Sequence, residues 1–140
     1  MRYYNEKGAT LVETAVTLPV FILVLFGFIQ LCLVAYTSLT LQYQVNNCLR
    51  WSSVYDEIVP GEDRFDSIKT QLTKNLNDFH VDTTQLEVNM CNGAVSNCTD
   101  TDAGNSGSFV TLQATVPAYN LFPLGQLVVT GRAVIKNEPF

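Results

Sequence analysis

Residues 15–36 read AVTLPVFILVLFGFIQLCLVAY, and this apolar stretch decides the fold. Only Thr17 and Gln30 are clearly polar among its 22 residues. At about 1.5 Å per helical residue the stretch spans roughly 33 Å, enough for a hydrocarbon core of about 30 Å. Lipid offers no partner to a free backbone N–H or C=O, so a single crossing is helical. The sequence therefore predicts one transmembrane helix, over residues 9–36, which Pro19 bends or loosens near its start.

The charges of the chain avoid this stretch. No Asp, Glu, Lys or Arg occurs between Glu13 and Arg50, a gap of 36 residues, and only 15% of the chain is charged. A soluble domain usually carries roughly 25%. The net charge of −5 argues against nucleic acid as a partner, because phosphate binding needs clustered Lys and Arg.

The flanks of the apolar stretch predict its direction in the membrane. Arg2 and Lys7 precede it, and the next basic residue is Arg50. Basic residues favour the cytoplasmic side, so we expect the N-terminus inside and the remainder of the chain exported. A cleavable secretory signal is the alternative, but its apolar core usually has about 7–15 residues, and Tyr36-Thr37-Ser38 offers no small-residue cleavage site.

A short motif, Lys7-Gly8-Ala9-Thr10-Leu11-Val12-Glu13, stands directly before the apolar stretch. An ionised carboxylate at mid-membrane costs about 2.5–3.5 kcal/mol, and less near the interface, so Glu13 indicates a function. Solvation among lipid headgroups is the plain alternative. The segment resembles the head of TadE-like pseudopilins, which are minor pilins of the tight-adherence (Flp, type IVc) pilus system. The resemblance covers about residues 7–30 and includes Gly8, Glu13, Pro19 and Gly27.

The resemblance implies that a prepilin peptidase cuts between Gly8 and Ala9, so that residues 1–8 are a cytoplasmic leader and Glu13 is the fifth mature residue. Glu13, Pro19 and Gly27 are the implied assembly residues. In a bundle, Glu13 would pair with the new Ala9 amine of a neighbour and fix the register between subunits. Many sequences of this system have an aromatic residue after the glutamate, whereas Thr14 follows here.

Residues 37–140 are expected to form an exported, pilin-like α+β domain. Apolar residues at helical spacing predict that the first helix continues over residues 37–55 and that a second helix covers residues 62–79. Alternating apolar residues predict three antiparallel strands at 84–91, 109–116 and 126–136. The positions expected in the core are Leu41, Val45, Cys48, Leu49, Trp51, Tyr55, Phe65, Ile68, Leu72, Leu76, Phe79, Leu86, Val88, Met90, Val110, Leu112, Ala114 and Val116.

The cysteines indicate a disulfide and not a metal site. Cys91 and Cys98 are expected to pair in the oxidising exterior, whereas Cys48 is either buried or linked to another chain. Cys32 lies in the membrane segment. One histidine, His80, and no CxxC pair leave no zinc site, and the oxygen-rich loop 100–107 departs from the EF-hand pattern. We expect no cofactor and no enzymatic activity.

The leading hypothesis is therefore a minor pilin or pseudopilin of a tight-adherence pilus. Its implied partners are the prepilin peptidase, other pilin subunits and minor pilins, the inner-membrane assembly platform and the membrane. It would reside in the inner membrane as a single-pass protein and then in the pilus or at the cell surface. Two alternatives stay open: a pseudopilin of type II secretion or DNA uptake, and an uncleaved anchor whose domain binds an extracellular ligand.

Overall fold

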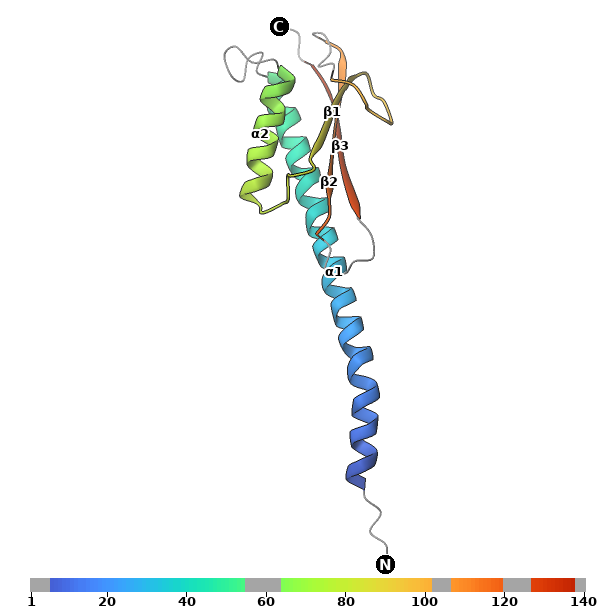
Figure 1. Ribbon diagram of the computed structural model, residues 1–140. Helices are drawn as coiled ribbons and strands as arrows, with labels where there is room; N and C mark the ends of the chain where they lie inside the picture. Colours follow the sequence, from blue (N-terminus) through green and yellow to red (C-terminus); the bar gives the residue numbers. More distant parts are fainter. Residues whose placement is uncertain (1–5, 55–63, 102–106, 120–126, 138–140) are drawn as a thin grey trace, which may run out of the picture.

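A computed structural model describes residues 6–54, 64–101, 107–119 and 127–137 of the chain. Its elements follow in the order α1 (Glu6–Val54), α2 (Arg64–Asp78), β1 (Glu87–Asn92), β2 (Phe109–Pro117) and β3 (Val128–Lys136). The lower half of α1 projects from a small domain made of its upper half and the other elements (Figure 1). This long helix, one further helix and a three-stranded sheet confirm the predicted pilin-like α+β layout.

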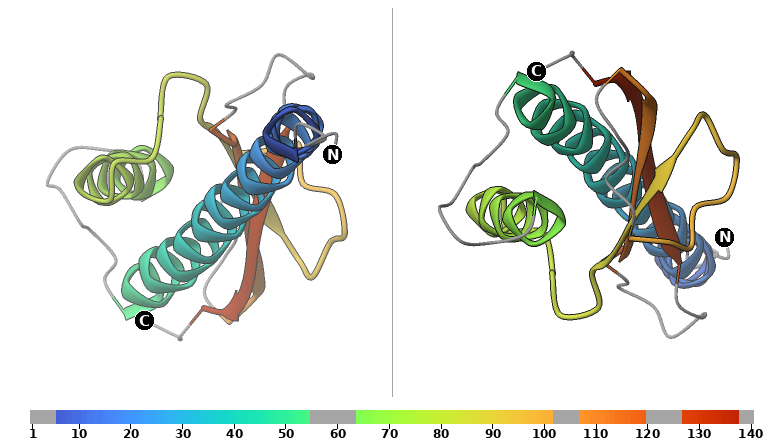
Figure 2. Two further views of the ribbon diagram at one scale, coloured as in Figure 1. Left: turned by 90° about the horizontal axis from the view of Figure 1, so that it is seen from below. Right: turned by 90° about the horizontal axis from the view of Figure 1, so that it is seen from above.

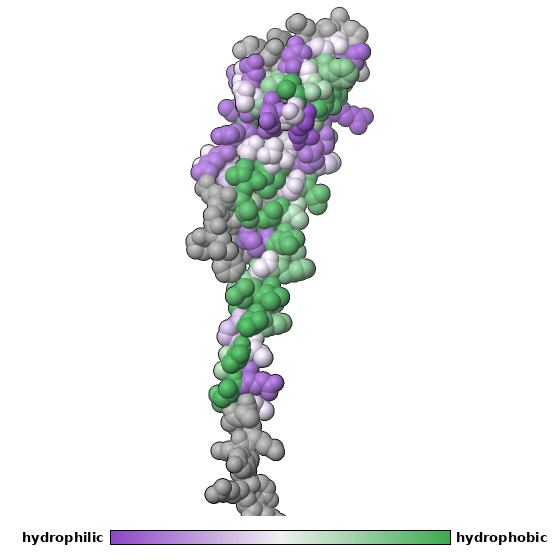
Figure 3. Space-filling model, turned by 90° about the vertical axis from the view of Figure 1, so that its right-hand side faces the viewer, coloured by the Kyte–Doolittle hydropathy of each residue, from purple (hydrophilic) through white to green (hydrophobic). Residues whose placement is uncertain are grey.

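The helix α1 runs without interruption through Pro19. Residues 10–29 are exposed on every side, and we refer to them as the stem. Hydrophobic residues predominate along the stem and continue onto the lower part of the domain, whereas hydrophilic residues gather higher up (Figure 3). Among the described residues, α1 is the one helix that is long and apolar enough to cross a membrane.

The upper half of α1 is the centre of the domain. It lies between α2 and the sheet (Figures 1 and 2). Because two layers flank it, its buried positions form a broad stripe: Thr37, Leu41, Gln44, Val45, Cys48, Leu49, Ser52 and Ser53. The same helix is therefore an exposed apolar stem over one half and a core element over the other.

The sheet is antiparallel, with the strand order β1-β2-β3. One face packs on α1, and β3 lies close against the helix at Gly131. A Cβ added at Gly131 would lie 2.9 Å from Leu41 Cγ and 3.3 Å from both the Leu41 carbonyl carbon and Val45 Cγ2. Only glycine therefore lets the strand lie this close to the helix.

Both outer edges of the sheet have hydrogen-bond partners. On β3, the backbone N–H of Arg132 donates to Gln42 Oε1 at 3.1 Å, and Gln42 Nε2 donates to the Arg132 carbonyl at 2.6 Å. On β1, the N–H of Met90 donates to the Asp100 carbonyl at 2.8 Å, next to a parallel bridge between Met90 and Thr101. Covered edges limit pairing with other chains.

Cys91 and Cys98 form a disulfide with a Cα–Cα distance of 5.7 Å. It holds the segment after β1 over the outer face of the sheet, where Thr111 Oγ1 donates to the Gly93 carbonyl at 2.7 Å. Gly93 has a φ of 96°, a backbone conformation that favours glycine. This loop explains why Thr111, on the face away from α1, is buried.

The helix α2 ends in a Schellman motif. The N–H of Val81 donates to the Leu76 carbonyl at 3.1 Å, and the N–H of His80 donates to the Asn77 carbonyl at 3.0 Å. His80 occupies the left-handed position with a φ of 57°, and Val81 is buried with Leu76. The lone histidine thus lies just past the end of α2, for which the sequence predicted a helix over residues 62–79.

Several expected positions differ in the structure. On α1, Trp51 is exposed. The face of α2 that packs inward is Ile68, Leu72 and Leu76, whereas Phe65 is half-buried and Phe79 lies beyond the helix and is exposed. The strand that was expected from residue 84 begins at Glu87, because residues 82–86 form the connection from α2. Residue 55, residues 62–63 and residue 126, where predicted elements began or ended, lie outside the described residues.

Candidate processing and assembly site

The Gly8–Ala9 peptide bond lies in the first turn of α1, which begins at Glu6. The first N–H groups of a helix have no intrahelical partner, so this turn is the easiest part of the helix to unwind. A protease that binds its substrate extended needs such unwinding, and Gly8 offers no side chain to obstruct it. Cleavage at this bond stays a prediction. Arg2, which was used to predict the orientation, lies outside the described residues.

Glu13 lies at the lower end of the stem and is exposed. The polar side chains next to it are satisfied within the helix. Thr14 Oγ1 donates to the Thr10 carbonyl at 2.8 Å, and Thr17 Oγ1 donates to the Glu13 carbonyl at 2.9 Å. Such bonds let a threonine lie in an apolar setting without an unpaired hydroxyl. The Glu13 carboxylate is therefore the group at the lower end of the stem that is chemically open to a partner outside the chain.

Pro19 and Gly27 are both exposed on the stem. At about 100° per residue, Gly27 lies within about 40° of Glu13 around the helix, whereas Pro19 lies about 120° away. A Cβ at Gly27 would meet nothing within 4 Å. The structure thus places Glu13 and Gly27 on one face, Pro19 on another, and leaves the space beside Gly27 open for a neighbouring helix. Their roles in assembly stay predictions.

The stem is fastened to the domain where it enters it. Gln30 Nε2 donates to the Tyr119 carbonyl at 2.8 Å, and the Tyr36 hydroxyl donates to the Phe79 carbonyl at 3.3 Å. Between these contacts an open cleft of about 1090 Å³ lies at the base of the domain, and its lining includes Leu33. We refer to this cleft as the basal cleft.

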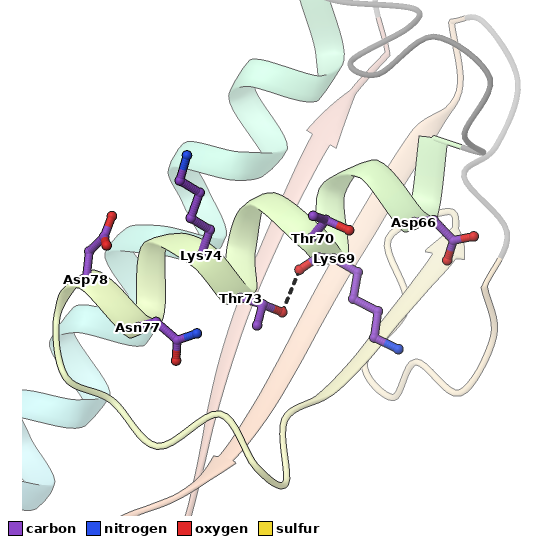
Figure 4. Close-up of a pocket in the computed structure, with 7 residues that line it drawn as sticks. All are labelled: Asp66, Lys69, Thr70, Thr73, Lys74, Asn77 and Asp78. Atoms are coloured by element: carbon purple, nitrogen blue, oxygen red, sulfur yellow. Dashed lines mark hydrogen bonds between the residues drawn. The ribbon is translucent and has the colours of Figure 1, made fainter.

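A second, shallower depression of about 720 Å³ lies on the outer face of α2. Its side chains spread along the helix and point outward, and the one bond between them runs from Thr73 Oγ1 to the Lys69 carbonyl at 2.7 Å (Figure 4). Lys69, Lys74, Asp66 and Asp78 do not converge on a common point (Figure 4). This arrangement is a solvated helix face and has the geometry of neither a catalytic nor a binding site.

The described residues contain no group of three or more His, Cys, Asp or Glu side chains that could hold a metal ion. Of the oxygen-rich loop 100–107, residues 102–106 lie outside the described residues. Cys48 is a free thiol buried between α1 and α2, where Asn75 Nδ2 lies 3.7 Å from its sulfur. Burial raises the pKa of the Cys48 thiol to about 11, against the smaller opposing effect of the Asn75 contact.

Sequence reasoning missed the residues that connect the domain to α1. Gln42 and Gln44 are polar residues of the amphipathic half of α1, where a polar side chain usually faces water, but Gln42 binds the β3 backbone and Gln44 is buried. Arg64 Nη2 donates to the Ser52 carbonyl at 2.7 Å and to Asn137 Oδ1 at 3.0 Å, joining the end of α1 to the end of β3. For these hydrogen-bonding residues, the available signal was a polar residue in an apolar run, such as Gln30.

The comparisons with known proteins bear on the segment that holds these residues. The family model described as TadE-like protein matches residues 8–50, which begin at the predicted cleavage site and end near the top of α1. No curated protein and no solved structure matches the chain. The match suggests an association with the Tad pilus system, and α1 has the length and composition of a single-pass anchor. Over residues 8–50, the chain is therefore similar to the TadE-like family.

Proposed function

We propose that the protein is a minor pilin or pseudopilin of a tight-adherence pilus, a structural subunit or assembly factor and not an enzyme. The observation that carries the proposal is the stem, a fully exposed apolar helix with one carboxylate at its base and a glycine five residues before that carboxylate. Contact between such a large apolar surface and water is unfavourable, so lipid or other helices are needed to cover it. The family match over the same residues supports the pilus assignment.

In the proposed sequence of events, the chain inserts with its N-terminus in the cytoplasm and the domain on the exported side. The prepilin peptidase removes residues 1–8, which takes Arg2 and Lys7 away and leaves a cationic amine on Ala9. Inside a helix bundle, that amine and the Glu13 carboxylate of a neighbour satisfy each other. The assembly platform and other pilin subunits then receive the stem by helix–helix packing.

The cleavage is tested by co-expression with the cognate prepilin peptidase and intact-mass analysis of the membrane-derived protein. The wild-type chain is expected to lose residues 1–8, and Gly8→Val is expected to keep them because the side chain obstructs the scissile bond. Gly27→Val, a glycine change in the same helix, serves as the matched control and should be cleaved normally. A wild-type chain that keeps Met1 beside a peptidase that processes a known pilin contradicts the proposal.

The role of Glu13 is tested by assembly. Glu13→Ala is expected to insert and to be cleaved, but to fall at least tenfold in the sheared pilus fraction, because the Ala9 amine is left without its partner. Thr17→Val removes a polar group one turn away that is already bonded inside the helix, so it should assemble normally. Normal recovery of Glu13→Ala from sheared pili contradicts the pairing of Glu13 with the Ala9 amine of a neighbour. It does not affect the conclusion on cleavage.

A further inference from the structure

The base of the domain carries a group of exposed apolar and aromatic side chains around the point where α1 leaves it. These side chains come from α1, from the segment after α2, from the segment after β2 and from the start of β3. We refer to them as the rim: Tyr36 (51% exposed), Phe79 (43%), Tyr119 (65%), Leu127 (50%) and Val128 (60%). The helix α1 links the rim to the stem, since Tyr36 belongs to α1 and lies seven residues after the end of the stem.

The rim sits at a fixed height along the stem. On one side of α1, Gln30 binds the Tyr119 carbonyl, and on another side Tyr36 binds the Phe79 carbonyl. The N–H of Ala118 donates to the Leu127 carbonyl at 2.7 Å, which holds the start of β3 to the end of β2 at the same level. These contacts fix the position of the rim relative to α1. They also set the length of α1 that lies free below the domain, which we call the free length of the stem.

This free length is shorter than a bilayer. From Glu13 to Gln30 the helix rises about 25 Å, whereas the hydrocarbon core is about 30 Å thick. If the Glu13 carboxylate stays at the inner boundary of the core, the outer boundary falls about 30 Å away, near Leu33. Leu33 lines the basal cleft, above the level at which Gln30 already touches the domain. Any tilt of the helix lowers the domain further into the lipid.

We propose that the rim is a lipid-binding surface, seated in the headgroup layer of the membrane that α1 spans. The proposal rests on the insertion of α1 in the proposed function. Tyrosine and other aromatic side chains favour this layer because they have an apolar body and, in tyrosine, a polar tip. Leu127 and Val128 add apolar area that would otherwise face water.

The charged residues at the base of the domain indicate which lipid headgroups the rim binds and how deep in the membrane the rim lies. The described lining of the basal cleft includes Asp82 and His80 but no Lys or Arg, so neutral headgroups suffice and anionic lipid adds no attraction. The Asp82 carboxylate accepts hydrogen bonds from the Thr84 hydroxyl and from the Thr84 N–H at 2.9 Å, which lower its pKa. An ionised Asp82 stays in the hydrated headgroup layer, so the rim lies at the boundary between the headgroups and the acyl core.

The experiment uses the full chain in phosphatidylcholine vesicles that contain lipids brominated at a shallow or a deep position. In a Trp51→Phe background, single reporters are introduced by Phe79→Trp, Tyr119→Trp and, in the stem, Phe26→Trp. The two rim reporters are expected to lose at least half of their fluorescence to the shallow bromines and less to the deep ones. Wild-type Trp51, near the far end of α1, should not be quenched by lipid.

The outcomes separate the rim from the insertion of the helix. Deep quenching of Phe26→Trp, together with rim reporters that only aqueous iodide quenches, overturns the proposal and leaves the insertion intact. Rim reporters that neither lipid nor iodide quenches overturn it as well, because the rim is then covered by another protein chain. An unquenched Phe26→Trp overturns the insertion and the rim proposal together.

Bilayer thickness gives a second test. The stem has a fixed length, so shallow quenching of Phe79→Trp and Tyr119→Trp is expected to rise as the phosphatidylcholine chains lengthen. Added salt and anionic lipid should leave it unchanged. Quenching that does not change with chain length contradicts the length argument on which the proposal stands.

Discussion

At the scale of single residues, His80 is a lone histidine that could suggest a functional site, but its position in the structure is that of the residue that ends α2. It occupies the left-handed position that closes α2, where the chain turns so that Val81 reaches the core. Glycine is usual there because a Cβ is unfavourable at positive φ. Sequence placed His80 at a helix end from its position after the amphipathic run. It did not specify the left-handed conformation, because histidine is an uncommon choice for it.

The first prediction concerns this residue. His80→Gly is expected to raise the free energy of unfolding by about 1 kcal/mol, because glycine adopts the left-handed conformation without strain. Asp78→Gly, two residues earlier and inside α2, is the control and should lower it by about 0.5–1 kcal/mol. Thermal unfolding followed by circular dichroism measures both. A His80→Gly protein less stable than wild type would mean that the imidazole makes a contact worth more than the backbone strain.

At the scale of elements, periodicity predicted which segments are helices and strands, because burial on one face leaves a period of 3.6 or 2 in the sequence. The positions on β2 that were expected to face inward, Val110 to Val116 in alternation, are all fully buried. The docking between elements was not predictable in the same way. Gln42 and Arg132 are far apart in the sequence, and an amide on a helix has the same pattern whether it binds water or a strand edge.

Gly131 is the exception, because its sequence context contained a usable signal. It interrupts a β-branched run, Val128 to Ile135, and a glycine inside a strand often marks the close approach of another backbone. The sequence did not say which backbone approaches. The structure identifies α1 at Leu41 and Val45. Strand and helix meet there with no room for a methyl group.

The second prediction tests this contact. Gly131→Ala is expected to lower the free energy of unfolding by about 1–3 kcal/mol, because the new methyl group displaces either Leu41 or the strand. Urea unfolding of the detergent-solubilised protein, followed by Trp51 fluorescence, measures the change. Gly27→Ala lies in open space on the stem and should leave the unfolding of the domain unaltered. Equal stabilities of Gly131→Ala and wild type would refute the close packing of β3 on α1.

At the scale of the whole molecule, the stem and the domain share one continuous helix, α1. The sequence indicated both halves of α1, but the junction between them depends on contacts from residues that are distant in the chain, such as Gln30 with Tyr119. The sequence left open whether Cys48 is buried or linked to another chain. The structure buries it at the centre of the domain. Its thiol therefore reports on the opening of the whole domain.

The third prediction uses this reporter in a Cys32→Ala background, where Cys48 is the remaining free thiol. Iodoacetamide is expected not to label the folded protein at pH 8 and to label it fully in urea, as measured by intact mass. The pKa is raised on folding, from about 9 to about 11, so the fold favours the neutral thiol. The contribution of the neutral Cys48 thiol to the stability of the fold is complete below pH 9 and is lost as the pH rises through 11. Rapid labelling without urea contradicts the burial.

In the proposed topology, in which the domain is exported, the packing of β3 against α1 also has a consequence for the timing of export. Leu41 lies early in the chain, and its partner Gly131 lies in the last strand. The core around α1 therefore cannot close until nearly the whole chain has crossed the membrane. Until then, the upper half of the helix shows an unfilled apolar stripe to the exterior. A chain that stalls before residue 128 leaves that stripe exposed, so that a protease or chaperone on the exported side can bind it.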